Sequence, residues 1–161
     1  SEVDKLHNNN IRLKIIGDKS AFSDKLQEKI RSAEQQTQHN QGLTLVIAAN
    51  YGGRWDITQA VQKIVDAIAI GELEAQAISE QLINQYLVTA DLPEPDLFIR
   101  SGGEERISNF LLWQLAYTEF YFTEALWPDF DQSLLEQAIT SFKSRQRRFG
   151  HTGEQMINKK R

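Results

Sequence analysis

The apolar residues of this chain recur with two periods, one typical of strands and the other of helices. Residues 11–17, "IRLKIIG", alternate and then become wholly apolar before a glycine, which predicts a strand. Residues 20–36 carry apolar side chains four positions apart, the spacing of one helix face. Residues 43–50, "LTLVIAAN", form a nearly continuous apolar run, which is typical of a strand buried on both faces of a parallel sheet.

The same alternation continues toward the C-terminus. A broad apolar stripe across residues 61–68 predicts a helix, and residues 79–87 predict a shorter one. The prolines of "DLPEP" then forbid helix continuation and lead into a strand at 96–100. The remaining predicted elements are a helix over 109–117, a short strand at 119–122 and an amphipathic helix over 134–148.

Alternating strands and helices predict an α/β fold, in which a parallel sheet is flanked by helices and the crossovers are right-handed. The length of 161 residues suits one domain, residues 1–161. In such folds ligands gather beyond the carboxyl ends of the strands. Asn50 and Arg100 both occupy such ends, so the loops that follow them are candidate sites.

Composition narrows the classes of function. The chain contains 40% hydrophobic and 25% charged residues, and its apolar runs are shorter than the ~20 residues of a membrane helix. It has no cysteine, which excludes disulfides and thiolate metal sites, and its three histidines lack metal-ligand spacing. A net charge of −4 disfavours broad binding of nucleic acid. The polar N-terminus is unlike a secretory signal, so we expect a cytoplasmic protein.

The segment "FIRSGGEERIS" carries the strongest candidate chemistry. Arg100 ends a predicted strand and Arg106 follows a glycine turn, so both guanidinium groups could converge on one anion, and a diphosphate would suit them. Ser108 is placed to cap the helix predicted over 109–117, and a helix start adds N–H groups for a phosphate. The local pattern leaves an equal alternative, in which the arginines pair with surface carboxylates: Glu104, Glu105 or Asp96.

Three other features admit a functional and a structural interpretation. Glu119 lies among aromatic residues in "YTEFYF" and needs a partner, either a hard cation such as Mg²⁺ or an arginine across an interface. In "NYGGRWDI", Asp56 would stabilise the dipole of the helix that follows, and Trp55 would pack in the core. The basic stretch "SRQRRFG" could reach a phosphate or only oppose a helix dipole. Spacing alone favours the structural interpretation of all three.

Taken together, "NYGGRWDI", "DLFIRSGGEERISNFLLWQLAYTEFYF", "LWPDFD" and "RQRRFG" resemble the cis-prenyltransferase family, and the ordered match spans nearly all 161 residues. The resemblance implies an enzyme that condenses isopentenyl diphosphate with an allylic, farnesyl-type diphosphate in cis, giving a long-chain polyprenyl diphosphate such as the undecaprenyl carrier lipid of cell-wall synthesis. It also implies Mg²⁺ as cofactor, a homodimer, no nucleic-acid partner and at most peripheral membrane association through the lipid product. With the resemblance, diphosphate binding by the arginine loop outweighs surface pairing.

The resemblance assigns roles to individual residues. Arg100, Arg106 and Ser108 match the positions that grip the diphosphate of isopentenyl diphosphate, and Ile107 contributes backbone between them. Glu119 matches the family's magnesium-associated glutamate. An "RxG"-like element, which in homodimers reaches the partner's substrate site, is matched by Arg148 and Gly150.

The resemblance further implies that the sequence is the C-terminal two thirds of a longer enzyme. The family's first catalytic motif, an "MDGNGRWA"-like sequence whose aspartate handles the allylic diphosphate and magnesium, is not among the 161 residues, so no catalytic residue is assigned here. Val3 and Leu6 have the spacing of the last apolar positions of a helix that begins earlier. Glu105 stands where some members have histidine, which puts a proton relay there in doubt. We expect the chain alone to be inactive, and two other classes stay open: a non-catalytic interaction subunit of a cis-prenyltransferase complex, and a different phosphate-binding enzyme.

Overall fold

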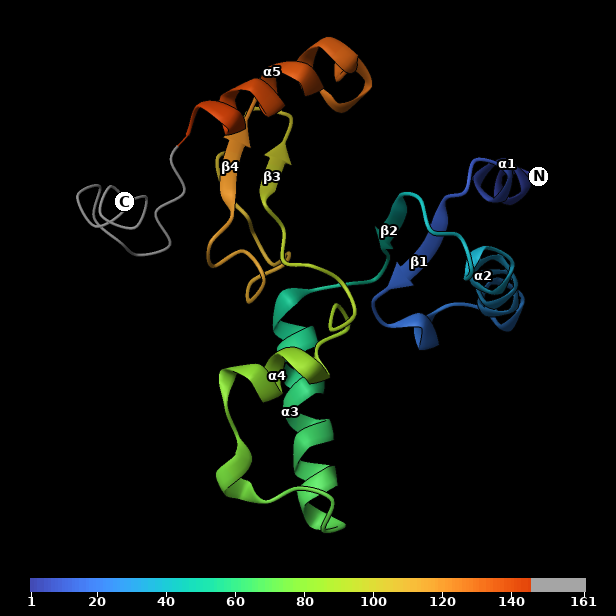
Figure 1. Ribbon diagram of the computed structural model, residues 1–161, viewed down its shortest axis with the longest axis vertical. Coiled ribbons are helices and arrows are strands. Elements are labelled where there is room, and N and C mark those ends of the chain that lie inside the picture. Colours follow the sequence, from blue (N-terminus) through green and yellow to red (C-terminus); the bar gives the residue numbers. More distant parts are fainter. Residues whose placement is uncertain (146–161) are drawn as a thin grey trace, which may run out of the picture. The chain divides into compact units, whose positions relative to one another are not determined.

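The structure, a computed structural model, describes residues 1–145 and divides into two compact units, Ser1–Pro93 and Glu94–Arg161. Each unit holds a pair of parallel strands together with helices (Figure 1). The predicted α/β fold with parallel strands and flanking helices is therefore confirmed. The prediction that residues 1–161 form one domain stays a prediction. No helix within residues 1–145 is long and apolar enough to cross a membrane.

The first unit contains the predicted strands at 11–17 and 43–50 and the predicted helices, with shifted ends. Ser79 caps the last helix of the unit, since its hydroxyl accepts a hydrogen bond from the N–H of Leu82 at 3.2 Å. The elements are α1 (Glu2–Asn8), β1 (Arg12–Ile16), the 3₁₀ helix η1 (Lys19–Ala21), α2 (Asp24–Thr37), β2 (Thr44–Ala48), α3 (Gly53–Ala69), the 3₁₀ helix η2 (Ala75–Ala77) and α4 (Glu80–Tyr86).

β1 and β2 pair in parallel, beginning with Arg12 opposite Thr44. In β2, Leu45 is 37% exposed and Ile47 is 45% exposed. The prediction that residues 43–50 are buried on both faces is therefore wrong for the part of the chain described. The physical reason is that α1 and α2 pack against β1, whereas an apolar run does not say which segment covers it. The residues of β1 that this packing buries are Leu13, Ile15 and Ile16.

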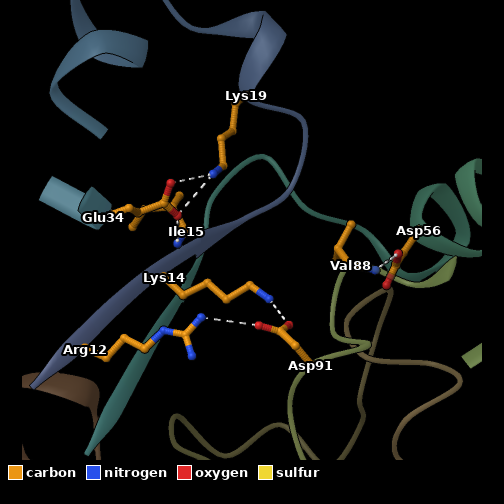
Figure 2. Close-up of polar contacts among 8 residues, drawn as sticks. All are labelled: Arg12, Lys14, Ile15, Lys19, Glu34, Asp56, Val88 and Asp91. Carbon is orange, nitrogen blue, oxygen red and sulfur yellow. Dashed lines mark hydrogen bonds and ion pairs between the residues drawn. The ribbon is translucent and has the colours of Figure 1, made fainter. Parts of the chain in front are cut away.

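The outer edge of β1 is closed by side chains of α2. The N–H of Leu13 donates to Thr37 Oγ1 at 3.0 Å, and the N–H of Ile15 donates to Glu34 Oε1 at 2.7 Å. Figure 2 shows the Glu34 carboxylate between Ile15 and Lys19, whose Nζ donates to it at 3.0 Å. These acceptors replace the carbonyl groups of a further strand, so both backbone donors are satisfied.

Asp91, in the loop after α4, ties that loop to β1 (Figure 2). Its carboxylate accepts hydrogen bonds from Lys14 Nζ and, at 3.5 Å, from Arg12 Nη2. The hydrogen bond from Lys14 holds the pKa of Asp91 below its ordinary value.

α3 buries a narrower stripe than the sequence predicted over 61–68. Val61 is 48% exposed and Val65 is 52% exposed. Positions spaced at four and three residues face the interior, which is the spacing of one helix face. The buried residues of this stripe are Ala60, Ile64 and Ala67.

Asp56 lies in the first turn of α3 and is only 1% exposed. Its carboxylate accepts a hydrogen bond from the Tyr51 hydroxyl at 2.8 Å and another from the N–H of Val88 at 3.0 Å. Asp56 thus lies in the first helical turn, where the sequence predicted that it would stabilise the helix dipole. It also joins α3 to a segment 32 residues away (Figure 2). Trp55 is partly exposed and makes an edge contact with the ring of Tyr51, so it lies at the margin of the core.

The second unit confirms both strands predicted in it. β3 (Leu97–Arg100) and β4 (Glu119–Phe122) pair in parallel, and η3 (Trp127–Asp129) and α5 (Gln132–Ser144) follow. Asp131 caps α5, because its carboxylate accepts a hydrogen bond from the N–H of Leu134 at 3.0 Å. One face of the strand pair is aromatic, because the ring of Phe98 packs against three others: Phe110, Phe120 and Phe122.

Two helix predictions in this unit are wrong. Residues 109–117 form turns and bends and no α-helix, although Leu115 is only 5% exposed. Tertiary packing of the apolar residues has here overridden helical propensity. α5 ends at Ser144, because Arg145 has an extended backbone with φ −86° and ψ 146°. The helix predicted over 134–148 therefore ends earlier, and residues 146–148 lie outside the described residues.

Candidate functional site

The candidate site is the loop that begins at the carboxyl end of β3, immediately after Arg100. Gly102 and Gly103 have φ of 87° and 74°, a left-handed conformation that costs other residues about 1–2 kcal/mol. The loop is fastened to the chain that follows β4, because the N–H of Gly102 donates to the carbonyl of Ala125 at 2.8 Å and that of Gly103 to the carbonyl of Thr123 at 3.0 Å. The glycine turn therefore has a defined geometry at the end of the sheet.

The loop brings together three of the residues that the sequence singled out. Arg100 Nη1 donates to the backbone carbonyl of Arg106 and lies 3.3 Å from Ser108 Oγ. The Arg100 guanidinium thus spans the loop from the strand end to its far side. Ile107 is half-buried between Arg106 and Ser108, and Glu105 is exposed in the same loop.

Arg106 pairs with a surface carboxylate, which was the alternative that the local sequence pattern left open. Its guanidinium forms an ion pair with the Glu104 carboxylate. The two side chains are 61% and 47% exposed, respectively. Exposed ion pairs of this kind contribute about 0–1 kcal/mol. Arg106 can therefore exchange Glu104 for a more highly charged anion at small cost.

Ser108 does not cap a helix, and the prediction that it would is wrong. Its φ is 53°, in the left-handed region, whereas an N-cap residue has an extended backbone. No α-helix follows it directly, because residues 109–117 form turns and bends. The groups that this loop could offer to an anion are the Arg100 and Arg106 guanidinium groups and the Ser108 hydroxyl, without a helix dipole.

At Gly103 both the backbone conformation and a neighbouring side chain, that of the exposed Glu124, oppose a Cβ atom. A Cβ atom built there would lie 2.6 Å from Glu124 Oε2, well inside van der Waals contact. At Gly102 no atom lies within 4 Å of such a Cβ, so only its backbone conformation favours glycine. Gly103 thus lets the loop lie close to the chain after β4.

Glu119 lies away from the arginine loop. It is opposite Leu97 at the beginning of β4, whereas Arg100 at the end of β3 is opposite Phe122. Three residues of strand separate these levels, about 10 Å at ~3.3 Å per residue. Because side chains alternate between the faces of a strand, Glu119 shares one face with Leu97, and Arg100 shares the other with Phe98. Within one chain, the structure does not bring Glu119 to the arginine loop.

The cationic partner of Glu119 is an arginine of the same unit. Arg145 Nη1 donates to Glu119 Oε2 at 3.1 Å. Among residues 1–145, no three His, Cys, Asp or Glu side chains come together in a way that could hold a metal ion. Carboxylate oxygens suit Mg²⁺, but one carboxylate bonded to an arginine does not fit a complete magnesium site. The remaining two candidates, Arg148 and Gly150, lie outside the described residues.

The sequence did not predict a cavity that lies at the carboxyl end of β3. A cavity of about 720 Å³ is lined by Ile99, Trp127 and Phe130, together with Arg100. The Trp127 and Phe130 rings are stacked, with centroids 6.1 Å apart and planes 11° apart. The segment "WPDF", which has two aromatic residues three positions apart around a proline, could have indicated this cavity. Arg145 was also missed, although it begins the basic stretch "RQRRFG".

Comparison with known proteins identifies the relatives of this chain. Residues 1–150 match the family described as "Putative undecaprenyl diphosphate synthase". A ditrans,polycis-undecaprenyl-diphosphate synthase ((2E,6E)-farnesyl-diphosphate specific) of Vibrio vulnificus is 58% identical over 156 residues, which are 97% of this chain and 62% of the relative. The same-named protein of Coxiella burnetii is 52% identical, over 96% of this chain and 65% of the relative. The chain thus spans less than two thirds of the length of the curated relatives it matches.

Two solved structures are similar as well. Lavandulyl diphosphate synthase from Lavandula x intermedia, crystallised with dimethylallyl diphosphate, is 43% identical with a TM-score of 0.90, over 94% of this chain and 66% of that one. A probable undecaprenyl diphosphate synthase from Campylobacter jejuni is 38% identical with a TM-score of 0.79, over 92% of this chain and 67% of that one. Both match in sequence and in backbone.

Proposed function

The chain belongs to the cis-prenyltransferase family, and we propose that it carries the isopentenyl diphosphate site of an enzyme that lengthens a cis-polyprenyl diphosphate. The full-length enzyme condenses isopentenyl diphosphate with an allylic, farnesyl-type diphosphate. Its product is a long-chain, undecaprenyl-type diphosphate that serves as carrier lipid in cell-wall synthesis. Support comes from relatives named as undecaprenyl-diphosphate synthases specific for (2E,6E)-farnesyl diphosphate.

The observation that carries the proposal is the contact of Arg100 with both the Arg106 carbonyl and the Ser108 hydroxyl across the glycine turn. This contact places the Arg100 guanidinium beside the Ser108 hydroxyl and the backbone of Arg106, at the carboxyl end of a parallel strand, where α/β folds bind ligands. Guanidinium forks match the oxygens of a diphosphate in geometry and charge. These groups support the proposal that the loop binds the anionic end of the substrate.

Binding of the diphosphate proceeds by exchange of partners. In the structure Glu104 is the anion that Arg106 binds, and the diphosphate displaces it because it carries more charge and more acceptor oxygens. Arg100 then shares its donors between the loop and the phosphate oxygens, Ser108 donates its hydroxyl hydrogen, and Ile107 contributes backbone. These contacts fix one end of isopentenyl diphosphate and so orient its alkene toward the allylic substrate.

The reaction joins the alkene of isopentenyl diphosphate to the allylic carbon, which releases the allylic diphosphate, and a proton then leaves the isopentenyl group. The residues of this chain bind and orient isopentenyl diphosphate. We assign none of them to the departure of the allylic diphosphate or to the proton transfer.

We also propose that the full-length enzyme uses Mg²⁺ and that Glu119 is one carboxylate ligand. Bound Mg²⁺ would neutralise charge on diphosphate oxygens. Support comes from the match of Glu119 to the family's glutamate, and the described residues alone do not complete a metal site. Glu119→Gln should raise the Mg²⁺ concentration for half-maximal rate, since the amide keeps the shape and loses the charge. Equal magnesium midpoints in both proteins would leave Glu119 a structural role.

We propose a homodimer for the full-length enzyme, in which Arg148 and Gly150 reach the substrate site of the partner subunit. The enzyme works in the cytoplasm, with membrane contact through its lipid product. Mixed dimers test this arrangement: Arg148→Ala subunits should complement Arg100→Ala subunits, because one of the two composite sites then holds both arginines. Failure of the mixture to exceed either parent would contradict it.

The central test is the Michaelis constant for isopentenyl diphosphate in full-length Arg100→Ala and Arg106→Ala. Each variant loses a charge-assisted contact of about 1.5–3 kcal/mol, so we expect the Michaelis constant to rise about 10- to 100-fold. Arg31→Ala is a matched control, because Arg31 also forms an exposed ion pair, with Glu28 at 2.5 Å. If Arg106→Ala behaves like Arg31→Ala, the loop does not bind this diphosphate.

A further inference from the structure

The two arginines of the loop after β3 differ in what they contact. The Arg100 guanidinium donates to the backbone carbonyl of Arg106 and, at 3.3 Å, to the Ser108 hydroxyl, and both acceptors are neutral. The Arg106 guanidinium is instead paired with the charged carboxylate of Glu104. An anion that binds both arginines therefore exchanges neutral contacts at Arg100, whereas at Arg106 it must break an ion pair.

The Glu104 carboxylate is tethered close to Arg106, because a single residue separates the two in the sequence. The backbone on both sides of the pair is held in place. The N–H of Gly103 donates to the carbonyl of Thr123 at 3.0 Å, and the carbonyl of Arg106 accepts from Arg100. Both paired side chains are exposed, so the pair can open by side-chain rotation alone. The pairing is intramolecular and is therefore present at any concentration of substrate.

We infer that Glu104 is an internal competitor of the substrate diphosphate, which occupies Arg106 in the empty site and so raises the concentration of isopentenyl diphosphate that the enzyme needs. An exposed ion pair of this kind is formed in roughly 60–85% of molecules. The apparent affinity for a ligand falls with the fraction of molecules whose site is free, here about two- to six-fold. This role rests on the proposed function of the arginine loop, and it gives the loop a residue that opposes substrate binding.

Steady-state kinetics of full-length Glu104→Gln test the inference, with isopentenyl diphosphate varied and farnesyl diphosphate saturating. Glutamine keeps the shape of the side chain and removes the charge that Arg106 binds. We expect the Michaelis constant for isopentenyl diphosphate to fall about two- to six-fold. The turnover number should stay unchanged, because Glu104 competes equally with the bound substrate and with the transition state.

Two comparisons separate the ion pair from a general effect of charge near the loop. Glu124→Gln is the matched control, because its exposed carboxylate lies against Gly103 of the same loop and the substitution removes the same charge. It should leave the Michaelis constant at the wild-type value. In an Arg106→Ala background, Glu104→Gln should have no effect, because the group that Glu104 occupies is then absent.

Three results would overturn the inference. The first is an unchanged Michaelis constant in Glu104→Gln. The second is a raised one, which would show that Glu104 holds Arg106 ready for the substrate. The third is an equal fall in Glu124→Gln or in the Arg106→Ala background, which would show an effect of charge alone. The proposed function fails by a different observation, an unchanged Michaelis constant in Arg106→Ala with Glu104 intact, so the two failures are distinguishable.

Discussion

Replacing the buried carboxylate of Asp56 should destabilise the first unit more than any exposed substitution in the same helix. Asp56 is 1% exposed, and its two oxygens serve donors from different segments: the Tyr51 hydroxyl at 2.8 Å and the N–H of Val88 at 3.0 Å. Asp56→Ala removes both acceptors and leaves no polar atom in their place. The change therefore breaks the connection between the start of α3 and the chain after α4.

The magnitude follows from the two donors. A buried donor that loses its partner costs about 1–3 kcal/mol, and both contacts are partly shielded from water, so each loss lies near the lower end of that range. We expect Asp56→Ala to lower the free energy of unfolding by about 2–3 kcal/mol. Asp56→Asn keeps an acceptor for Val88 and should cost about 1 kcal/mol.

Urea unfolding of the full-length protein, followed by far-ultraviolet circular dichroism, measures these differences. Asp66→Ala is the matched control, because Asp66 lies on the same helix, is exposed and accepts a hydrogen bond from Gln62 Nε2 at 2.9 Å. It should change the free energy of unfolding by less than about 0.5 kcal/mol. If Asp56→Ala costs no more than Asp66→Ala, the assignment of the Asp56 contacts to stability is refuted.

Gly103→Ala should raise the Michaelis constant for isopentenyl diphosphate several-fold, because both its φ of 74° and the nearby Glu124 oppose a Cβ; Gly71→Ala, with φ of 77° and no atom near its Cβ, should leave that constant unchanged. Asp91→Asn should lower the free energy of unfolding at pH 7, and the difference should shrink as the pH falls below about 4, because Lys14 depresses the pKa of Asp91 in the folded state and protonation removes that stabilisation. Urea titrations from pH 3 to pH 7 measure it, and a difference as large at pH 3 as at pH 7 would contradict it. The 161-residue chain alone should incorporate no radiolabelled isopentenyl diphosphate into long-chain product, since it lacks the aspartate motif that the family resemblance assigns to the allylic diphosphate; robust incorporation by material of confirmed mass would contradict this.

The elements that could be predicted from the sequence are those whose pattern is local. The strands at 11–17 and 119–122 are marked by β-branched and aromatic residues that end at glycine or follow a turn, and both are present. The segment 109–117 has the apolar spacing of a helix but forms turns, because the backbone entering it at Ser108 is left-handed and its side chains pack against distant residues such as Phe98. Periodicity records which residues are buried and does not determine the backbone that buries them.

The candidate site could be predicted in part for the same reason. Arg100, Arg106 and Ser108 are close in sequence, and a short glycine turn brings them together. The Glu119 contact with Arg145 spans 26 residues and depends on how α5 crosses the strands, which no local pattern encodes. The motif resemblance named Glu119 as a functional residue and could not show that, within one chain, it faces away from the arginines.

The closed edge of β1 has a consequence for how the first unit can associate with other chains. An open strand edge is a template for pairing with any extended segment, and so for aggregation. Because Thr37 and Glu34 already accept the backbone hydrogens of Leu13 and Ile15, a newly arriving strand would find these donors occupied. β2 pairs with β1 along one edge, and in the described sheet its opposite edge carries no further strand. Extension of the described sheet is therefore directional: a strand can join it only beyond β2, because α2 closes the β1 side and so prevents continuous edge-to-edge stacking.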